Sequence, residues 1–346
     1  MKTVGTTATD LIREGVRNLV SNCLDVQPGE SILLLNERGR IAPELVDLME
    51  EGVRQCRGEC HSLWGETIER GQRTFPKVLL GALLSADKVI MNYNLDREVL
   101  HQYVKDHQIL RVTNRCLRPE LFATEHARFH WGMVRAIFAH LEEIVSDASE
   151  WHITGSGGTD LSGKMADASD VAGAYFVQEA EATRLIRVFP GEVYTPVGVK
   201  EASGRIVADA PNVDDPTLSS EPVTFTIENS RIVRIDGEER AQRVRDGMEA
   251  AAARFGHESA YTIDSWHGGM NPRADSNPRG IGGISTTERM HFHARTLGGN
   301  FGATVGRQTI EVGRKTIFEN GKLTVLNDPE LREAAVRFGV EDWPPA

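Results

Sequence analysis

Three histidines in the last third of the chain are the residues best suited to chemistry. His291 and His293 are separated by one residue, so in a strand both would lie on one face, because strand side chains alternate with a period of two. His267 lies a short way upstream. Neutral imidazole is a common ligand of zinc, iron and copper, and two imidazoles on one face can bind one ion. The pattern therefore predicts a metal site, with a hydrogen-bonded structural pair as the alternative interpretation.

Glycines surround these histidines. Residues 266–273 are predicted to form a strand followed by a glycine-rich turn, and residues 295–306 contain four glycines. Glycine lets a backbone approach a ligand closely, so we expect these glycines to make room for a bound molecule. Neither stretch places a GxGxxG pattern between a strand and a helix, which argues against a dinucleotide site or a P-loop.

Sequence signatures of a serine or cysteine nucleophile are weak in this chain. The chain contains no GxSxG motif. Its four cysteines all fall within the first 116 residues, far in sequence from the late histidines, and form no CxxC pair. We expect these cysteines to pack as small hydrophobic residues.

A carboxylate could complete a metal site, because the common iron site combines two histidines with one carboxylate. Glu192 follows a Pro-Gly turn within residues 189–196 and is the candidate; a solvated turn carboxylate is the alternative. The Gly-Gly-Thr-Asp run at 157–160 has a different interpretation. Thr and Asp side chains often bind nearby backbone amides, so this run is predicted to be a structural turn.

The elements that must position these residues fall into two groups. The first 145 residues alternate helical and strand patterns, which favours an α/β fold with a doubly wound, mostly parallel sheet flanked by helices. Apolar spacing and turn residues predict helices at 11–23 and 43–55, and strands at 31–35, 86–92 and 109–113.

The pattern changes after a predicted helix at 129–145. From there glycines are frequent and short strands dominate, so we expect an α/β domain at 1–145 and an α+β domain, carrying the metal site, at 146–346. Two hairpins are clear, at 223–235 and 315–325. In the second, Asn320 and Gly321 can supply the positive φ angles of a tight turn.

Composition limits the classes of partner. The chain has 346 residues and a formal charge of −11, from 39 basic and 50 acidic side chains. This balance disfavours nucleic acid, whose phosphates require clustered lysine and arginine, and favours a small-molecule or peptide ligand, with a small-molecule substrate expected. The polar, amphipathic start and the lack of a long apolar run predict a cytoplasmic protein that does not enter a membrane.

Most of the chain resembles the aminopeptidase T type of metallo-aminopeptidase and the related 2,5-dihydroxypyridine 5,6-dioxygenases. The resemblance rests on motifs in matching order: Val-Gln-Pro-Gly-Glu before the first strand, Ile-Thr-Gly-Ser-Gly-Gly-Thr-Asp-Leu, Pro-Gly-Glu-Val-Tyr-Thr-Pro, the first hairpin, Gly-Gly-Met-Asn-Pro-Arg-Ala and the last hairpin. They lie at 26–30, 153–161, 190–196, 223–235, 268–274 and 315–325. Both families form homo-oligomers, so the resemblance implies self-association.

The resemblance also implies roles for single residues. Glu192 matches the glutamate of the aminopeptidase metal site, and His101 matches an acid–base histidine of the dioxygenases. The stretch after His293 is more similar to the dioxygenases, in which a hydroxyl residue lies near iron. Thr304 is at about that position, and it or Arg295 would orient the substrate ring.

One departure from both families is clear. They carry a late His-x-Asp that binds metal, whereas residues 300–311 contain no histidine or aspartate. A metal-ligand position that both families have further upstream matches Ser265 in this chain. His267 lies two residues after Ser265 and is therefore on the same face of the strand. We expect His267, His291 and His293 to rebuild the site; loss of the metal is the alternative.

Three functions follow from these patterns. The first is a ring-opening dioxygenase of a hydroxylated pyridine-like heterocycle, with Fe(II) held by His267, His293 and Glu192 and with His101 moving protons. The second is a hydrolase, an aminopeptidase or an amide-ring opener, that uses zinc or another divalent metal to activate water. The third is a metal-free binding protein that keeps the fold and has lost the catalyst.

Overall fold

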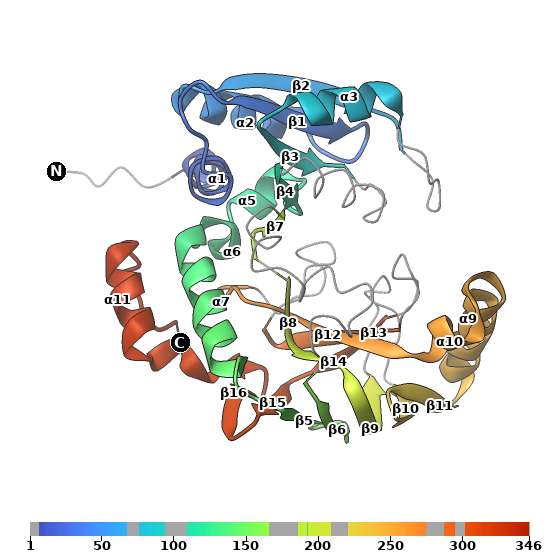
Figure 1. Cartoon of the computed structure of the whole chain (residues 1–346). Helices are drawn as coiled ribbons and strands as arrows, with labels where there is room; N and C mark the ends of the chain where they lie inside the picture. Colours follow the sequence, from blue (N-terminus) through green and yellow to red (C-terminus); the bar gives the residue numbers. More distant parts are fainter. Residues whose placement is uncertain are drawn as a thin grey trace. The chain divides into compact units, whose positions relative to one another are not determined.

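The computed structural model describes residues 7–67, 76–93, 109–165, 186–191, 193–208, 221–274, 287–294 and 302–345, and for some strand and helix residues among them only the backbone. The chain divides into two compact units (Figure 1). The first extends to Arg135 and also contains the segment around strand β7; the second contains most of the remaining chain. The change of unit at Arg135 lies inside helix α7 (Trp131–Val145).

The first unit is built on a five-stranded parallel sheet, so the predicted α/β class is confirmed. The strand order is β2-β1-β3-β4-β7, and each neighbouring pair is parallel. The strands are β1 (Ser31–Glu37), β2 (Glu59–Gly65), β3 (Lys88–Asn92), β4 (Leu110–Asn114) and β7 (Ile186–Phe189). The helices of this unit are α1 (Ala8–Arg17), α2 (Pro43–Gln55), α3 (Lys77–Ser85), α5 (Pro119–Phe122) and α6 (Glu125–Arg128).

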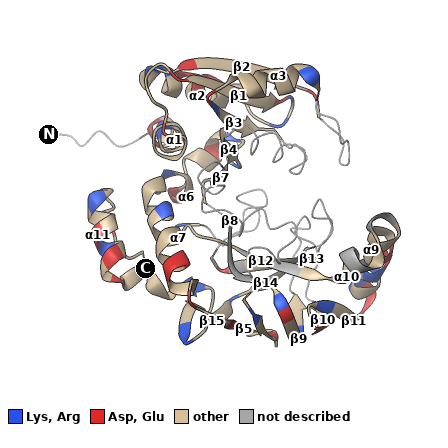
Figure 2. Cartoon of the chain, in the orientation of Figure 1, with Lys and Arg blue, Asp and Glu red and all other residues tan. Residues whose placement is uncertain are grey.

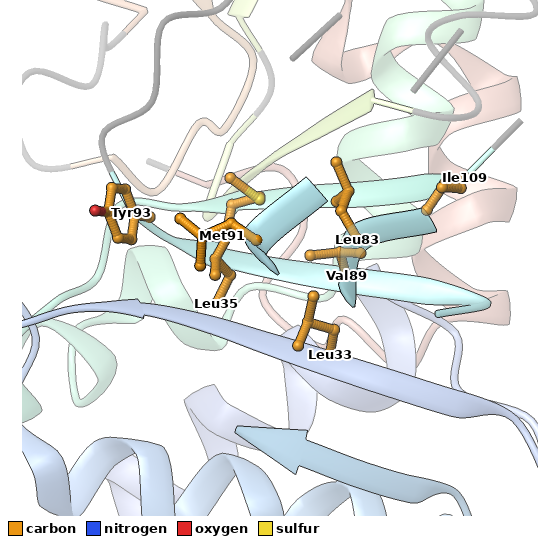
Figure 3. Packing of buried hydrophobic residues seen from close by; sticks show 8 residues of the cluster. Leu33, Leu35, Leu83, Val89, Met91, Tyr93 and Ile109 are labelled. Carbon is orange, nitrogen blue, oxygen red and sulfur yellow. The ribbon is translucent and has the colours of Figure 1, made fainter. Parts of the chain in front are cut away.

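Burial explains why these segments form a sheet and its covering helices. Strand β1 is buried along almost its whole length, as expected for a strand with both faces covered. One face packs with α3 in a cluster made by Leu33, Leu35, Leu79, Leu83, Val89, Met91, Tyr93 and Ile109 (Figure 3). Helix α2 begins with Pro43, whose fixed φ suits the first helical position, and buries Leu45 and Met49.

The predicted helix at 11–23 is in fact two elements. Helix α1 ends at Arg17 and continues as a π-helix, Asn18–Cys23. At the junction the buried Asn18 side chain donates from Nδ2 to the backbone oxygens of Ala127 at 2.8 Å and Phe129 at 2.7 Å. Its Oδ1 accepts from the backbone nitrogen of Trp131 at 3.0 Å. One amide thus ties the helix pair to the α6–α7 connection.

Replacing Asn18 with alanine should lower the free energy of unfolding by about 3 kcal/mol, because it leaves three buried backbone groups without these partners. Urea unfolding followed by circular dichroism measures the change. Asn22→Ala is the matched control, since Asn22 gives a single bond, to Asn18 Oδ1 at 3.0 Å. Equal losses from the two variants would contradict the tethering role of Asn18.

Strand β7 was not predicted. It pairs with β4 although a long segment separates them in sequence, and Phe189 packs against Phe122 and Trp131 with ring centroids 5.7 and 6.3 Å apart. Only four residues form this strand. Its parallel partner is non-local, and such pairing leaves no local signal.

The second unit contains two antiparallel sheets, which agrees with the predicted wealth of short strands. The larger has the order β11-β10-β9-β6-β5-β15-β16-β17, and the smaller the order β14-β13-β12-β8. The larger sheet contains β5 (Glu150–Gly155), β6 (Asp160–Lys164), β9 (Lys200–Ala208), β10 (Val223–Glu228), β11 (Arg231–Asp236), β15 (Gln308–Val312), β16 (Lys315–Glu319) and β17 (Lys322–Leu323). The smaller contains β8 (Val193–Gly198), β12 (Ile263–Gly269), β13 (Arg289–Ala294) and β14 (Gly302–Gly306).

Helices cover the ends of this unit. They are α9 (Glu239–Phe255), α10 (His257–Tyr261) and α11 (Pro329–Arg337), with a short 3-10 turn, Thr324–Asn327, before α11. Helix α11 mixes acidic and basic residues on its surface and buries Leu331, Ala334 and Ala335 (Figure 2). None of the helices that the structure describes is long and apolar enough to cross a membrane.

Both predicted hairpins are confirmed, but the second one is shorter than predicted, because β17 ends at Leu323 and a 3-10 turn begins at Thr324. Strands β10 and β11 pair around Asn229 and Ser230, and β16 and β17 pair around Asn320 and Gly321; all four turn residues have positive φ. The run at 157–160 is structural as predicted, but its side chains do not bind nearby backbone amides: Asp160 begins β6, and its Oδ1 bonds the His152 ring at 2.9 Å. Thr159 is buried, and its Oγ1 exchanges hydrogen bonds with the backbone of Val207 on β9.

Candidate metal centre

The histidine-rich segments form adjacent strands of the four-stranded sheet. In the antiparallel pair β12–β13, His267 lies opposite His291 and Ser265 lies opposite His293. In the pair β13–β14, His291 lies opposite Thr304. Residues directly opposite one another in such a ladder share a face of the sheet. The positions of His267, His291 and Thr304 therefore form one row across three strands, which we call the histidine row.

Packing shows which face of the sheet this row occupies. Trp266, Met290 and Phe292 alternate with the histidines and are fully buried. The Phe292 ring lies 6.0 Å from the Trp266 ring and meets Phe225 of β10 edge-on at 5.3 Å, so this face packs against the larger sheet. Because strand side chains alternate, the histidine row is assigned to the opposite face.

The described members of the row are partly or largely removed from water. His291 is 8% exposed and Thr304 is half-buried. A buried imidazole needs polar partners, so a position this dry favours a ligand or hydrogen-bonding role over a solvated one. The structure describes only the backbone of His267 and His293, and the roles predicted for their side chains stay predictions.

The glycines beside the row do not all act as predicted. Gly268 and Gly269 are not in a turn; they continue β12 and pair with Tyr194 and Val193 of β8. A Cβ at Gly268 would lie 2.2 Å from the Cε of Met290, so the space that this glycine leaves is filled by Met290 rather than by a ligand. On β14, Gly302 and Gly306 flank Thr304, and these small residues stand next to the histidine strand.

The turn that follows β12 has a structural role. Asn271 is buried, and its Oδ1 accepts from the backbone nitrogen of Arg273 at 3.0 Å. The Arg273 guanidinium donates to the backbone oxygen of Asp342 at 2.8 Å. These bonds fix the chain at the end of the strand that carries His267.

Three predicted site residues, His101, Glu192 and Arg295, lie outside the described residues. Within the part of the chain that the structure describes, no group of three or more His, Cys, Asp or Glu side chains could hold a metal ion. The complete set of metal ligands therefore stays a prediction. The backbone shows only the strand register, which places His267 and His291 opposite each other.

Two of the cysteines, Cys60 and Cys116, are unsuited to nucleophilic chemistry. All four are free thiols. Burial raises the pKa of Cys60 to about 11, with the carboxylate of Glu50 adding to the effect, and burial also raises the pKa of Cys116. Neither is a thiolate at neutral pH, and the thiolate is the nucleophilic form.

Comparisons with known proteins agree on one fold. A family model described as "NicX: 2,5-dihydroxypyridine 5,6-dioxygenase" matches residues 17–317. The structure is similar to that of 2,5-dihydroxypyridine dioxygenase from Pseudomonas putida KT2440, with a TM-score of 0.68 and 16% identity, over 94% of this chain and 99% of that one.

A second similar structure is wild-type AmpT from Thermus thermophilus, with a TM-score of 0.54 and 15% identity, over 92% of this chain and 100% of that one. A search of curated proteins finds no significant match. At these identities the two structures show that the fold is shared; the family model additionally covers most of the sequence.

Proposed function

Because the chain belongs to the 2,5-dihydroxypyridine 5,6-dioxygenase family, we propose that it uses Fe(II) and molecular oxygen to open the ring of a hydroxylated pyridine-like heterocycle. Membership makes the chain a dioxygenase-type enzyme. The identity of the metal and that of the substrate ring are our proposals beyond family membership.

The observation that supports a metal-dependent reaction is the histidine row. His267 and His291 are register partners on adjacent strands, opposite Thr304 on the third. Antiparallel partners have Cβ atoms about 4.5–5.5 Å apart, a spacing that lets two imidazoles converge on one ion. Imidazole nitrogens suit both iron and zinc, so the donor types fit the proposed metal.

The residues proposed to hold the metal come from His267, His291, His293 and Glu192: His267 and His291 are register partners in the row, and His293 lies two residues along β13 on the same face. When bound, Fe(II) held by two histidines and a carboxylate supplies open coordination positions for oxygen and for the hydroxylated ring. His291, nearly excluded from water, would help to keep this face dry. A dry site strengthens the electrostatic interactions inside it.

The remaining predicted residues would act on the substrate. Thr304 would hydrogen-bond a ring hydroxyl, since a threonine hydroxyl both donates and accepts. Arg295 would orient the ring by its fixed fork of N–H donors. His101 would accept and return a proton, because its ordinary pKa is near neutrality.

Oxygen uptake tests this function. Protein loaded anaerobically with Fe(II) should consume oxygen on addition of 2,5-dihydroxypyridine or a related hydroxypyridine, and both atoms of ¹⁸O₂ should enter the product. The zinc-loaded protein is the control. Release of amino acids from small peptides without oxygen would instead support a hydrolase, and failure across a panel of hydroxypyridines would overturn the proposal.

Replacing Thr304 with valine keeps the side-chain shape and removes the hydroxyl. We expect the KM for the hydroxypyridine to rise about 10-fold with little change in kcat, because a lost hydrogen bond costs about 1–1.5 kcal/mol. Steady-state oxygen uptake measures both constants. Thr226→Val is the matched control, since Thr226 is a half-buried strand threonine of the larger sheet. An unchanged KM for Thr304→Val would remove Thr304 from the site.

A further inference from the structure

Strand β2 forms an open edge of the parallel sheet in the first unit. It pairs with β1 on one side, and none of the strands that the structure describes pairs with its other side. The burial of the two strands differs accordingly: no residue of β2 is buried, whereas all but the first residue of β1 are. A strand with an open side presents unpaired N–H and C=O groups, which can pair with another strand.

The hydrogen bonds to β1 show which backbone groups of β2 point to the open side. The Glu59 nitrogen donates to the Glu30 oxygen at 2.8 Å, and the Gly65 oxygen accepts from the Arg38 nitrogen at 3.0 Å. The odd-numbered residues therefore direct their N–H and C=O groups toward β1. Because this direction alternates along a strand, the even-numbered residues direct theirs outward. The outward-directed residues are Cys60, Ser62 and Trp64.

The other sheet edges in the described part of the chain are poorer templates for strand pairing. Strands β7, β14 and β17 are short, with four, five and two residues. Strand β8 contains Pro196, and β11 carries the charges of Arg231, Arg234 and Asp236. Strand β2 has seven residues, no shift of register against β1, no proline and a single charge, at Glu59. Proline, charges and short length are the usual protections of an edge, and β2 lacks them.

A second copy of β2 complements this edge in the antiparallel orientation. If Ser62 lies opposite Ser62 of the second copy, Cys60 lies opposite Trp64. All three outward-directed residues then exchange both backbone hydrogen bonds across a two-fold axis. Any other antiparallel register leaves at least one of the three without a partner inside the strand. The strand is therefore self-complementary in one register.

Charges at the ends of the strand favour the same orientation. Arg57 is exposed and lies just before β2, and Glu66 lies directly after it with a side chain that is 83% exposed. Glu66 Oε1 contacts the Nε of Arg38 at 3.1 Å, in a pair that is itself mostly exposed. An antiparallel pair brings the Arg57 end of each copy to the Glu66 end of the other. Opposite charges attract across such a pair, whereas parallel copies would bring like charges together.

We propose that β2 is the interface through which two copies of this chain pair, edge to edge and antiparallel, so that their two parallel sheets become one continuous sheet. The pairing satisfies the outward-directed backbone groups of both copies. It goes beyond the proposed function, because it uses no residue of the candidate metal centre. A contact of seven residues per copy is small for a protein interface, so the association should depend on protein concentration.

Sedimentation velocity of the full chain over a range of concentrations tests the interface. Wild-type protein should form a species with twice the mass of one chain, or an even multiple of it. Ser62→Pro removes the central outward N–H, at an edge position where proline leaves the bonds to β1 intact, and should weaken association at least 10-fold. Ser62→Ala is the matched control. It removes the bond from Ser62 Oγ to Glu50 Oε1 at 2.6 Å but keeps the N–H, and should associate as wild type.

A charge exchange tests the orientation. Glu66→Arg places two arginines near each other at both ends of the pair and should weaken association by about 5-fold, the upper range for an exposed ion pair. Adding Arg57→Glu to Glu66→Arg restores opposite charges and should restore the association. A double variant that associates as weakly as Glu66→Arg alone would contradict the antiparallel pairing.

The remaining outcomes also decide the inference. It is overturned if wild type stays a single chain at every concentration, or if Ser62→Pro associates as tightly as Ser62→Ala. Circular dichroism shows whether each variant is folded. If Ser62→Pro does not fold, hydrogen exchange of the wild type replaces it: amides of residues 59–65 should exchange more slowly at high protein concentration, and equal exchange rates at low and high concentration would overturn the interface.

Discussion

Replacing His267 with alanine is expected to abolish metal binding and oxygen-dependent turnover. Loss of a residue that only supports a metal ligand costs 10–100-fold in metal affinity or activity, so loss of a ligand should cost more than about 100-fold. The backbone register supports the choice of residue, since His267 lies directly opposite His291. Titration with Fe(II) and oxygen uptake on the same sample measure the two effects.

His257→Ala is the control for this variant. His257 lies in the same unit on helix α10, exposed, with its ring stacked on Tyr261 at 4.4 Å. It should bind metal and turn over as wild type. Full metal occupancy in His267→Ala and in His293→Ala would show that the ligand assignment is wrong.

Replacing Phe292 with alanine should have the largest effect on stability, about 3–5 kcal/mol of unfolding free energy. Phe292 is fully buried between Trp266 and Phe225, and it lies between the two histidines of β13. Truncating it leaves a cavity under the strand that carries the site. We therefore expect metal affinity to fall as well, although the histidines are unchanged.

Chemical unfolding of three variants checks this expectation. Phe292→Leu retains most of the buried volume and should cost less than Phe292→Ala. Val233→Ala removes apolar volume at a position of β11 that is 48% exposed, and should change stability by less than about 0.5 kcal/mol. A Phe292→Ala protein as stable as Val233→Ala would contradict the assignment of this face to the core.

Local sequence patterns predicted the helices and strands that are determined by residues within the element or its turn. Helix α2 begins and ends at the predicted residues because Pro43 starts it and its apolar face is regular. The hairpin at β16 and β17 follows from the turn chemistry of Asn320 and Gly321, both with positive φ. Strand β1 was predicted from its continuous apolar run and extends two residues further, to Glu37.

Elements with distant causes were missed. The π-helix after Arg17 begins at Asn18, whose side chain donates to backbone oxygens more than a hundred residues away in the sequence. Strand β7 exists through its pairing with β4. Neither partner is visible from local spacing, because both depend on tertiary contact.

The candidate site shows the same division. The two-residue period of a strand predicts that His291 and His293 share a face. This prediction does not depend on knowing the neighbouring strand. Which residue lies opposite each histidine depends on the register of β12, including an irregularity between Ile263 and Ser265. The sequence alone could not show that His267 lies opposite His291 on the neighbouring strand. Nor could it show that the Met290 side chain fills the space left by Gly268.

Elemental analysis of protein purified without chelators tests most directly the proposal that the histidine row supplies ligands to the metal centre of an iron-dependent dioxygenase. Wild-type protein should hold about one iron per chain, and His267→Ala should lose it. Stoichiometric zinc in place of iron would contradict the dioxygenase and favour a hydrolase. Protein that holds no metal, even after anaerobic addition of Fe(II), would contradict the metal centre itself.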